Sequence, residues 1–323
     1  MQWQLCTLLC GLGLFLLGMS LLGGTLAQRR GTQLETQLRR LTRTRAGSWL
    51  AGFSVTAAVH SSSAVTVLLV GLVDAGLLPL SRAADVIMGA NAGTTVTAWL
   101  LCLRGPDGYT GLLRAGLLLL GAALWALGRR PALRSLGRCT LGLGILLYGM
   151  AQMSASAAAL QGGAAAQQLL AGLSHPLRGL AAGALTTAVI QSSTAGVGIL
   201  QALCAGGHIP LTAVVPIILG QNIGTCVTAC LAAVRGGAGA RQTAAFHLLF
   251  NALGAALLLP LYLCAARAFP ALDSPATGVR IALAHTLFNV LSAALLAPLT
   301  PLLCKWCTIL TGAPTAKPQK TAR

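Results

Sequence analysis

Two short polar runs interrupt long apolar stretches of the chain. His60-Ser61-Ser62-Ser63 lies within one apolar stretch, and Gln191-Ser192-Ser193-Thr194 lies within another. A continuous helix would turn some of these hydroxyl groups towards lipid, whereas a hairpin that enters the membrane and returns would gather them at its tip, beside a cavity. Ser also favours the N-cap, the position that begins a helix. We therefore expect re-entrant helical hairpins over 51–80 and 181–211, although small Ser residues also permit close helix packing.

A second pair of polar motifs follows these runs. Asn91-Ala92-Gly93-Thr94-Thr95 and Asn222-Ile223-Gly224-Thr225 each lie near the middle of the next apolar stretch. Asn and Gly often end helices, and Thr often begins them. The motifs predict broken helices over 83–103 and 214–234, of the kind that binds substrate near the middle of the membrane in transporters. A glycine-mediated kink is the alternative.

The expected site contains almost no charge. Only Asp74, Arg82 and Asp85 are charged between residues 51 and 100, and no residue is charged between 182 and 231. Arg82 and Asp85 are expected to pair, and Asp74 to be a solvated turn residue rather than a cation ligand. Each half-helix N-terminus carries about half a positive charge and free N–H groups, so four converging ends would bind a small oxyanion. Oxygen atoms at the opposite helix ends suit Na+.

The composition indicates the elements that position these residues. With 55% hydrophobic residues, 8% charged residues and a mean hydropathy of +0.78, the chain is expected to be an all-α integral membrane protein. The first 27 residues are interpreted as a retained helix rather than a signal peptide. The net charge of +17 arises from Lys and Arg in short segments between apolar runs, which encodes membrane topology and argues against a nucleic-acid partner. Cys304 and Cys307 have the spacing of a redox or metal motif. A single CxxC motif is weak evidence, so a packing role is the favoured interpretation.

An internal repeat organises the chain. Residues 51–100 align without a gap on residues 182–231, with 21 identities in 50 positions. Segment 28–48 contains six Arg, whereas the equivalent segment 159–179 contains only Arg178. Because positive residues favour the cytoplasmic side, the equivalent segments are expected on opposite sides of the membrane. The sequence therefore predicts two inverted-topology repeats.

The predicted topology places the N-terminus outside and the C-terminus in the cytoplasm, which leaves 17 of the 22 basic residues inside. The first repeat is expected over 1–130 and the second over 131–263. A final transmembrane helix is expected over 278–303, followed by a basic cytoplasmic tail over 304–323.

The paired motifs resemble those of the type II sodium/phosphate cotransporter family and its bacterial relatives. Each hairpin tip is followed by a G-x-N-x-G-T pattern, at Gly89 and again at Gly220, and the resemblance extends to the His-x-Leu-Phe-Asn patterns that begin at His247 and His285. The resemblance implies Na+-driven uptake of inorganic phosphate across a bacterial cytoplasmic membrane, through an elevator-like movement of the hairpin-bearing domain. It implies phosphate, sodium ions and the lipid bilayer as partners, a possible homodimer, no enzymatic activity and no cofactor besides the coupling ion.

The same resemblance assigns candidate ligands at the two tips and the two downstream motifs. The phosphate ligands are expected to be Ser61, Ser62, Ser63, Ser192, Ser193, Thr194, Asn91, Asn222, Thr94 and Thr225. The Na+ ligands are expected to be His60, Gln191, Ser62, Ser193, Thr95, Asn91 and Asn222.

Two departures from the family pattern affect these expectations. His60 stands where the family usually has Gln, and because His can titrate near neutral pH, proton coupling or another oxyanion stays open as an alternative. Many bacterial relatives also carry a C-terminal PhoU-like cytoplasmic domain, whereas this sequence ends in the short basic tail. A membrane-embedded enzyme is disfavoured because His60 and Ser61 are sequence neighbours, a poor arrangement for a base and its nucleophile. The i, i+4 pairs His247/Asn251 and His285/Asn289 are expected to be satisfied by interhelical hydrogen bonds rather than to bind a ligand, and His175 and His208 to lie in outer loops.

Overall fold

The computed structural model describes residues 2–27, 41–103, 109–161, 175–206 and 209–312. These residues form helices joined by short connections, and no strand occurs in the described ranges. The α-helices are α1 (Gln2–Ala27), α3 (Arg45–Val59), α4 (Ser62–Asp74), α5 (Leu80–Leu100), α6 (Tyr109–Leu127), α7 (Pro131–Gln161), α9 (Pro176–Ile190), α10 (Ser193–Leu203), α11 (Leu211–Ala233), α12 (Ala238–Ala268), α13 (Gly278–Leu296) and α14 (Thr300–Thr311). The 3-10 helices are η1 (Cys204–Gly206), η2 (Pro270–Asp273) and η3 (Ala297–Leu299).

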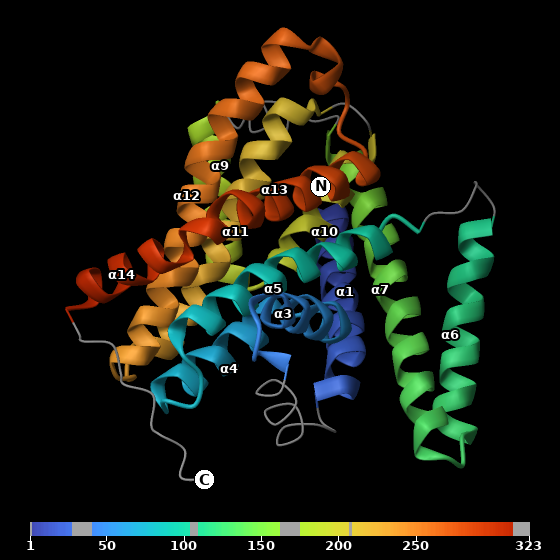
Figure 1. Ribbon diagram of the computed structural model, residues 1–323. Coiled ribbons are helices and arrows are strands. Elements are labelled where there is room, and N and C mark those ends of the chain that lie inside the picture. The colour runs from blue at the N-terminus through green and yellow to red at the C-terminus, as the bar shows by residue number, and fades with distance from the viewer. Residues whose placement is uncertain (1, 28–40, 104–108, 162–174, 207–208, 313–323) are drawn as a thin grey trace.

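The helices form two groups. Helices α1 and α7 pack along their length, and α6 packs on the far side of α7 at the edge of the molecule (Figure 1). Glycine residues allow α1 and α7 to approach closely. A side chain at Gly18 would clash with the backbone of Leu146, and one at Gly149 would clash with the backbone of Phe15. Helices α3–α5 and α9–α14 form the second group, which contains all the candidate ligands.

The described helices agree with an integral membrane protein. Four segments are long and apolar enough to cross a membrane: Trp3–Leu22, Leu211–Ala233, Ala238–Ala268 and Gly278–Thr311. Helices α4, α9 and α10 are apolar but shorter, as expected for elements that enter a membrane without crossing it. Re-entrance itself stays a prediction.

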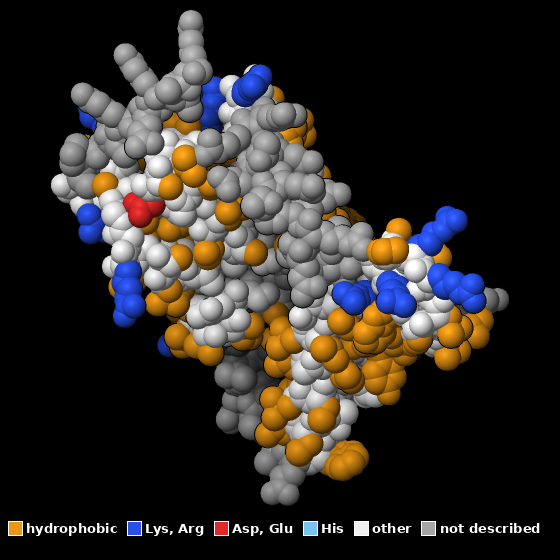
Figure 2. Space-filling view, turned by 90° about the horizontal axis from the view of Figure 1, so that it is seen from below, with side chains coloured by type: hydrophobic (Ala, Val, Ile, Leu, Met, Phe, Trp, Pro, Cys, Tyr) orange, Lys and Arg blue, Asp and Glu red, His pale blue; other side chains and the backbone are white. Residues whose placement is uncertain are grey.

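The basic connections lie at a common end of the molecule. The α6–α7 turn and the α11–α12 turn lie low in Figure 1, whereas the α12–α13 connection lies at the top. Viewed from below, Lys and Arg side chains gather near the α6–α7 end and along the opposite edge (Figure 2). Most of the Arg residues of segment 28–48 and most of segment 159–179 lie outside the described residues, as do His208 and the tail after Gly312. The inverted orientation of the repeats and the sidedness of the termini therefore stay predictions.

The expected breaks in the helices at Asn91 and Asn222 are wrong. Helix α5 continues through Asn91 and Gly93, and α11 continues through Asn222 and Gly224. Hydroxyl and amide groups of both motifs donate to carbonyls of the preceding helical turn, which satisfies them without unwinding the helix.

The glycines of these motifs serve close helix packing instead. A side chain at Gly89 would clash with the Trp49 carbonyl of α3, and one at Gly220 would clash with the Leu180 carbonyl of α9. Small residues that let two backbones approach are typical of helix contacts within membranes, because packing rather than the hydrophobic effect holds helices together there. Glycine residues that were expected to break α5 and α11 therefore allow the neighbouring helix to pack closely instead.

The expected final helix over 278–303 is also incorrect in its extent. Helix α13 ends at Leu296, the 3-10 turn η3 follows, and α14 continues to Thr311. Pro298 and Pro301 cannot donate the backbone hydrogen bonds of a regular helix, which explains the irregular turn between the two helices. The first part of the predicted tail is therefore helical.

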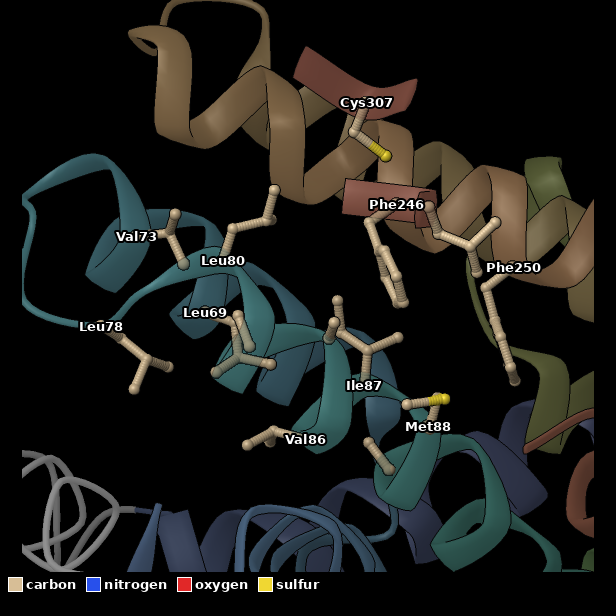
Figure 3. Close-up of a cluster of buried hydrophobic side chains, with 14 of the residues drawn as sticks. Leu69, Val73, Leu78, Leu80, Val86, Ile87, Met88, Phe246, Phe250 and Cys307 are labelled. Carbon is tan, nitrogen blue, oxygen red and sulfur yellow. The ribbon is translucent and has the colours of Figure 1, made fainter. Parts of the chain in front are cut away.

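A cluster of buried side chains joins the first hairpin to the C-terminal helices. Leu69 of α4, Ile87 of α5, Phe246 and Phe250 of α12 and Cys307 of α14 pack together (Figure 3). The two Phe rings are stacked with centroids 6.3 Å apart, and dispersion contacts of this kind sum to a substantial stabilisation. The packing fixes α4 and α5 against α12 and α14.

Candidate functional site

The first helix break lies where the sequence predicts it. Helix α3 ends at Val59, and His60 adopts the left-handed conformation with φ 57° and ψ 27°, which only a few non-glycine residues do. The backbone N–H of His60 donates to the Thr56 carbonyl at 2.7 Å. Ser61 is then the N-cap of α4, and its hydroxyl accepts a hydrogen bond from the Ala64 N–H at 3.2 Å. The chain thus ends one helix and begins the next within two residues.

The second break has nearly the same backbone geometry. Gln191 adopts φ 58° and ψ 25°, and its N–H donates to the Thr187 carbonyl at 2.6 Å. Ser192 is the N-cap of α10 and accepts a hydrogen bond from Ala195 at 3.2 Å. Ser61 and Ser192 differ by 1° in φ and by 6° in ψ. The prediction that each polar run separates two helices is therefore confirmed.

The two breaks lie side by side. The Ser63 hydroxyl donates to the Gln191 carbonyl across the interface at 3.4 Å. Helix α4 also contacts α11, and α10 contacts α5, so each half of the chain packs against the other. Two half-helix N-termini, those of α4 and α10, are available for an anion. The sequence predicts four, and the difference follows from the continuous helices α5 and α11.

Hydroxyl groups at these N-termini are available for a ligand. Ser62 and Ser193 are the first residues of α4 and α10, and their residues are 4% and 5% exposed. Among the described residues, neither side chain has a hydrogen-bond partner. Thr194 is similarly buried. Free N–H groups, a positive helix end and unpaired hydroxyls form a site that favours an oxyanion.

His60 is held beside the first break by α5. Its ring Nδ1 lies 2.9 Å from the Thr97 hydroxyl, and the residue is half-buried. Gln191 at the second break is exposed. The two equivalent residues therefore differ both in chemistry and in surroundings.

The Asn residues of the downstream motifs are bonded differently from each other. The Asn91 amide donates to Asn251 Oδ1 of α12 at 3.0 Å, whereas the Asn222 amide donates to the Ile218 carbonyl of its own helix at 2.9 Å. Neither amide nitrogen therefore donates to a residue of the tips. Hydroxyls of the same motifs donate within their own helices, and the residues concerned are Thr94, Thr95 and Thr225.

Several oxygen atoms near the breaks were not predicted as ligands. The hydroxyls of Thr56 and Thr187 and the Gln221 carboxamide oxygen are buried without a hydrogen-bond partner among the described residues. A side chain added at Gly196 would lie 3.0 Å from the Gln221 carboxamide and 3.1 Å from the Thr187 hydroxyl, so these groups converge on α10. Thr56 and Thr187 are identical in the two aligned segments, and that identity is the signal that could have identified them.

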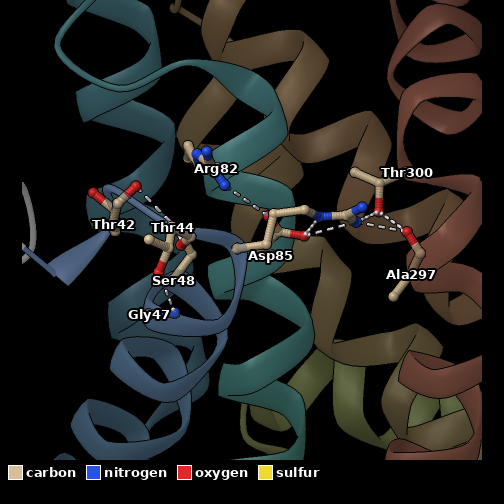
Figure 4. A network of polar contacts seen from close by, with 9 residues as sticks. Thr42, Thr44, Gly47, Ser48, Arg82, Asp85, Ala297 and Thr300 are labelled. Carbon is tan, nitrogen blue, oxygen red and sulfur yellow. Dashed lines mark hydrogen bonds and ion pairs between the residues drawn. The ribbon is translucent and has the colours of Figure 1, made fainter.

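The charged residues near the first hairpin form a structural network. Asp85 lies 3.8 Å from Arg82, as predicted, but 3.2 Å from Arg45 of α3 (Figure 4). Arg45 also donates to the Ala297 carbonyl at 2.6 Å and to Thr300 at 3.1 Å. The network connects α3, α5 and the α13–α14 junction, and sequence spacing gave no sign of this long-range pairing.

Asp74 also has a structural contact. Its carboxylate accepts hydrogen bonds from the N–H groups of Gly237 at 3.0 Å and Ala240 at 3.2 Å, at the start of α12. A carboxylate favours the positive N-terminus of a helix. The expected solvated turn residue is therefore a helix cap supplied by another segment.

The His-Asn pairs of α12 and α13 differ from expectation. The amides of Asn251 and Asn289 donate to the backbone carbonyls of His247 and His285, at 2.9 and 2.8 Å. Both imidazole rings are buried, and within the described part of the chain their nitrogen atoms have no partner. The expected interhelical hydrogen bond is formed by Asn251, which accepts from Asn91 of α5, but not by either imidazole ring. Of the two histidines predicted in outer loops, His175 precedes α9.

Comparisons with known proteins identify the family of the chain. The sequence model described as Na+/Pi-cotransporter matches residues 14–155 and 145–267. The uncharacterized protein YqeW of Bacillus subtilis (strain 168) is 36% identical over 270 residues, which are 83% of this chain and 85% of YqeW. The putative inorganic phosphate export protein YjbB of Escherichia coli (strain K12) is 28% identical over 247 residues, which are 76% of this chain and 44% of YjbB.

A mammalian relative matches over a shorter range. The sodium-dependent phosphate transport protein 2A of Rattus norvegicus is 38% identical over 96 residues, which are 28% of this chain and 15% of that protein. No solved structure is significantly similar to the chain. The ranges matched by the family model extend over most of the 323 residues and include both helix breaks. The chain therefore belongs to the Na+/Pi-cotransporter family.

Proposed function

We propose that the protein is a secondary active transporter that couples the Na+ gradient to movement of inorganic phosphate across a bacterial cytoplasmic membrane. The observation that carries this proposal is the meeting of the two helix breaks, where the Ser63 hydroxyl donates to the Gln191 carbonyl. Membership of a phosphate-transporting family supports the substrate.

Phosphate binds at the N-termini of α4 and α10. Backbone N–H groups and the hydroxyls of Ser62 and Ser193 donate to its oxygen atoms, and Thr194 adds a third hydroxyl. No Lys or Arg is needed, because helix N-termini already favour an anion. The flanking Ser61 and Ser192 hydroxyls contribute mainly as N-caps, since each accepts a backbone N–H.

Sodium ions bind at the opposite helix ends. Helices α3 and α9 stop at the breaks, so their last carbonyls lack the usual intrahelical partners. Half-helix C-termini and hydroxyl oxygens coordinate Na+ in other transporters with discontinuous helices. An ion beside the phosphate would offset its charge, which provides coupling between the two substrates.

Transport follows an elevator-like movement. The group α3–α5 and α9–α14 carries the breaks, and the group α1, α6 and α7 stays fixed in the membrane. The packing of α1 and α6 on α7 supports this division, and α7 meets the other group mainly at α10. The two overlapping ranges matched by the family model support two repeats, which we propose are inverted.

Direction and coupling ion have alternatives. YjbB is named as a putative phosphate export protein. Reversal of the driving ion gradient would give export of phosphate from the same site. His60 in place of Gln supports a second candidate function, proton coupling, because imidazole titrates near neutral pH.

The deciding experiment is uptake of radiolabelled phosphate into proteoliposomes that contain the purified protein. An inward Na+ gradient is compared with K+ under a matched pH gradient. We expect uptake that requires Na+. Uptake that follows only the pH gradient would replace Na+ by H+, and uptake in neither condition would contradict phosphate transport.

A further inference from the structure

A cavity at the basic end of the molecule lies apart from the helix breaks. Its volume is about 690 Å³, and it is lined by the α4–α5 turn, the first turns of α12 and one face of α14. The α4–α5 turn and the start of α12 lie together low on the left in Figure 1, and α14 lies above them. None of its lining residues belongs to the proposed phosphate site, and ligand binding in the cavity does not depend on the proposed function.

The lining of the cavity is amphipathic. Leu78, Pro79 and Ile309 supply apolar walls, while Ser81, Thr308 and Lys305 supply polar groups. Lys305 is exposed, and no ion pair with a described carboxylate involves it. The arrangement suits a molecule with an apolar chain and an anionic head.

The charges around the cavity favour an anion. Arg82 follows the lining residue Ser81, and Arg241 precedes the lining residue Gln242. Asp74 follows Val73, but its carboxylate is occupied by the N–H groups at the start of α12. Arg82 pairs with Asp85, whereas Lys305 and Arg241 form no ion pair with a described carboxylate. The unpaired charge near the lining is therefore positive, and the predicted cytoplasmic side is the leaflet that presents anionic lipids.

The neighbouring side chains indicate the depth of the cavity in the membrane. Trp306 is 42% exposed beside Lys305, and Ile309 is 66% exposed one turn later. Trp and Lys concentrate at the headgroup level of a membrane, where an apolar body meets a polar surface. The cavity therefore opens at the boundary between headgroups and acyl chains.

We propose that this cavity binds an anionic phospholipid of the cytoplasmic leaflet. The headgroup phosphate pairs with the Lys305 ammonium group and accepts a hydrogen bond from the Ser81 hydroxyl, whereas the Thr308 hydroxyl donates to the Cys304 carbonyl of its own helix. An acyl chain lies along the apolar walls formed by α4, α5 and α14. The bound lipid joins the first hairpin to the C-terminal helix.

Native mass spectrometry of the full chain in detergent tests the proposal. The protein is titrated with phosphatidylglycerol and, separately, with phosphatidylcholine of the same acyl chains. We expect selective retention of phosphatidylglycerol. We expect Lys305→Gln to weaken that retention about fivefold, because one basic residue near anionic lipid contributes about one kcal/mol, and Thr308→Trp to weaken it by placing a ring among the lining residues.

Matched variants separate the site from general effects. Arg129→Gln removes a charge from the α6–α7 turn outside the cavity, and Leu310→Trp adds a ring to α14 at a residue that does not line it. Both are expected to bind lipid as the parent does. Equal retention of the two lipids, unchanged retention in both cavity variants, or displacement of the lipid by excess inorganic phosphate would each overturn the proposal.

Discussion

The two helix-break regions share a backbone but not their side-chain partners. The backbone angles of His60 and Gln191 agree within 2°. Yet His60 contacts Thr97, whereas Gln191 is exposed, and Asn91 bonds another helix, whereas Asn222 bonds its own. The Ser N-cap and the left-handed residue determine the break, and the side chains around it are free to differ. Two similar scaffolds can therefore hold two unequal half-sites.

The largest expected effect tests the scaffold that the two regions share. Gly220→Val and Gly89→Val each place a side chain against a backbone carbonyl of the neighbouring helix. We expect each variant to lose more than about 3 kcal/mol, because a backbone cannot move aside as a side chain can. The measurement is thermal unfolding in detergent. Gly116→Val on α6, where an added side chain meets no atom within 4 Å, is the control.

Equal losses in Gly89→Val and Gly220→Val would support equivalent packing in the two halves. A variant that melts like the Gly116→Val control would contradict the close helix contact in that half.

The next largest effect compares the phosphate ligands of the two halves. Ser62→Ala and Ser193→Ala remove an unpaired hydroxyl from the start of α4 or α10. A hydrogen bond to an ionised group contributes about 1.5–3 kcal/mol, so each change should lower phosphate transport about tenfold or more. Melting temperatures should change little, because neither hydroxyl bonds another described residue.

Transport into proteoliposomes measures this effect, with Ser54→Ala on an exposed position of α3 as the control. Parent-like transport in both site variants would show that the hydroxyls at the helix starts do not bind phosphate. A loss in only one would assign the phosphate mainly to that half.

The third prediction separates the two Asn residues. Asn91→Ala leaves the buried Asn251 carbonyl without its donor, so we expect a loss of about 1–3 kcal/mol in the free energy of unfolding. Asn222→Ala removes only a bond to its own helix, so stability should fall less. If Asn222 binds a substrate, transport by this variant should fall strongly. Chemical unfolding and transport assays on the same samples distinguish the two residues, and equal stability losses would contradict the asymmetry.

The smallest effect concerns the residues in the left-handed position. His60→Gln makes the first break resemble the second, and a carboxamide can still reach Thr97. We expect Na+-dependent phosphate uptake to persist with an unchanged dependence on pH near neutrality. Gln191→His is the reciprocal control. A pH dependence that disappears in His60→Gln would instead assign proton coupling to the imidazole.

Local sequence chemistry was sufficient to locate both helix breaks. Ser61 and Ser192 are strong N-cap residues within long apolar stretches, and their chemistry acts over three or four residues along the chain. The composition indicates a membrane protein, because long apolar helices with few charged residues are stable in lipid rather than in water. The gap-free alignment of two segments indicated an internal duplication. Together with the motifs at the two tips, it indicated the resemblance to the family.

The roles of the polar residues after each break depend on contacts between helices. Gly89 and Gly220 are compatible with a broken helix or with a close contact, and the choice depends on the helix that packs beside them. The Arg45–Asp85 pair and the Asp74 cap join residues that are 40 or more positions apart. Local preference extends over a single helical turn, whereas these contacts exist only once the helices have packed, and that is why no spacing rule predicts them.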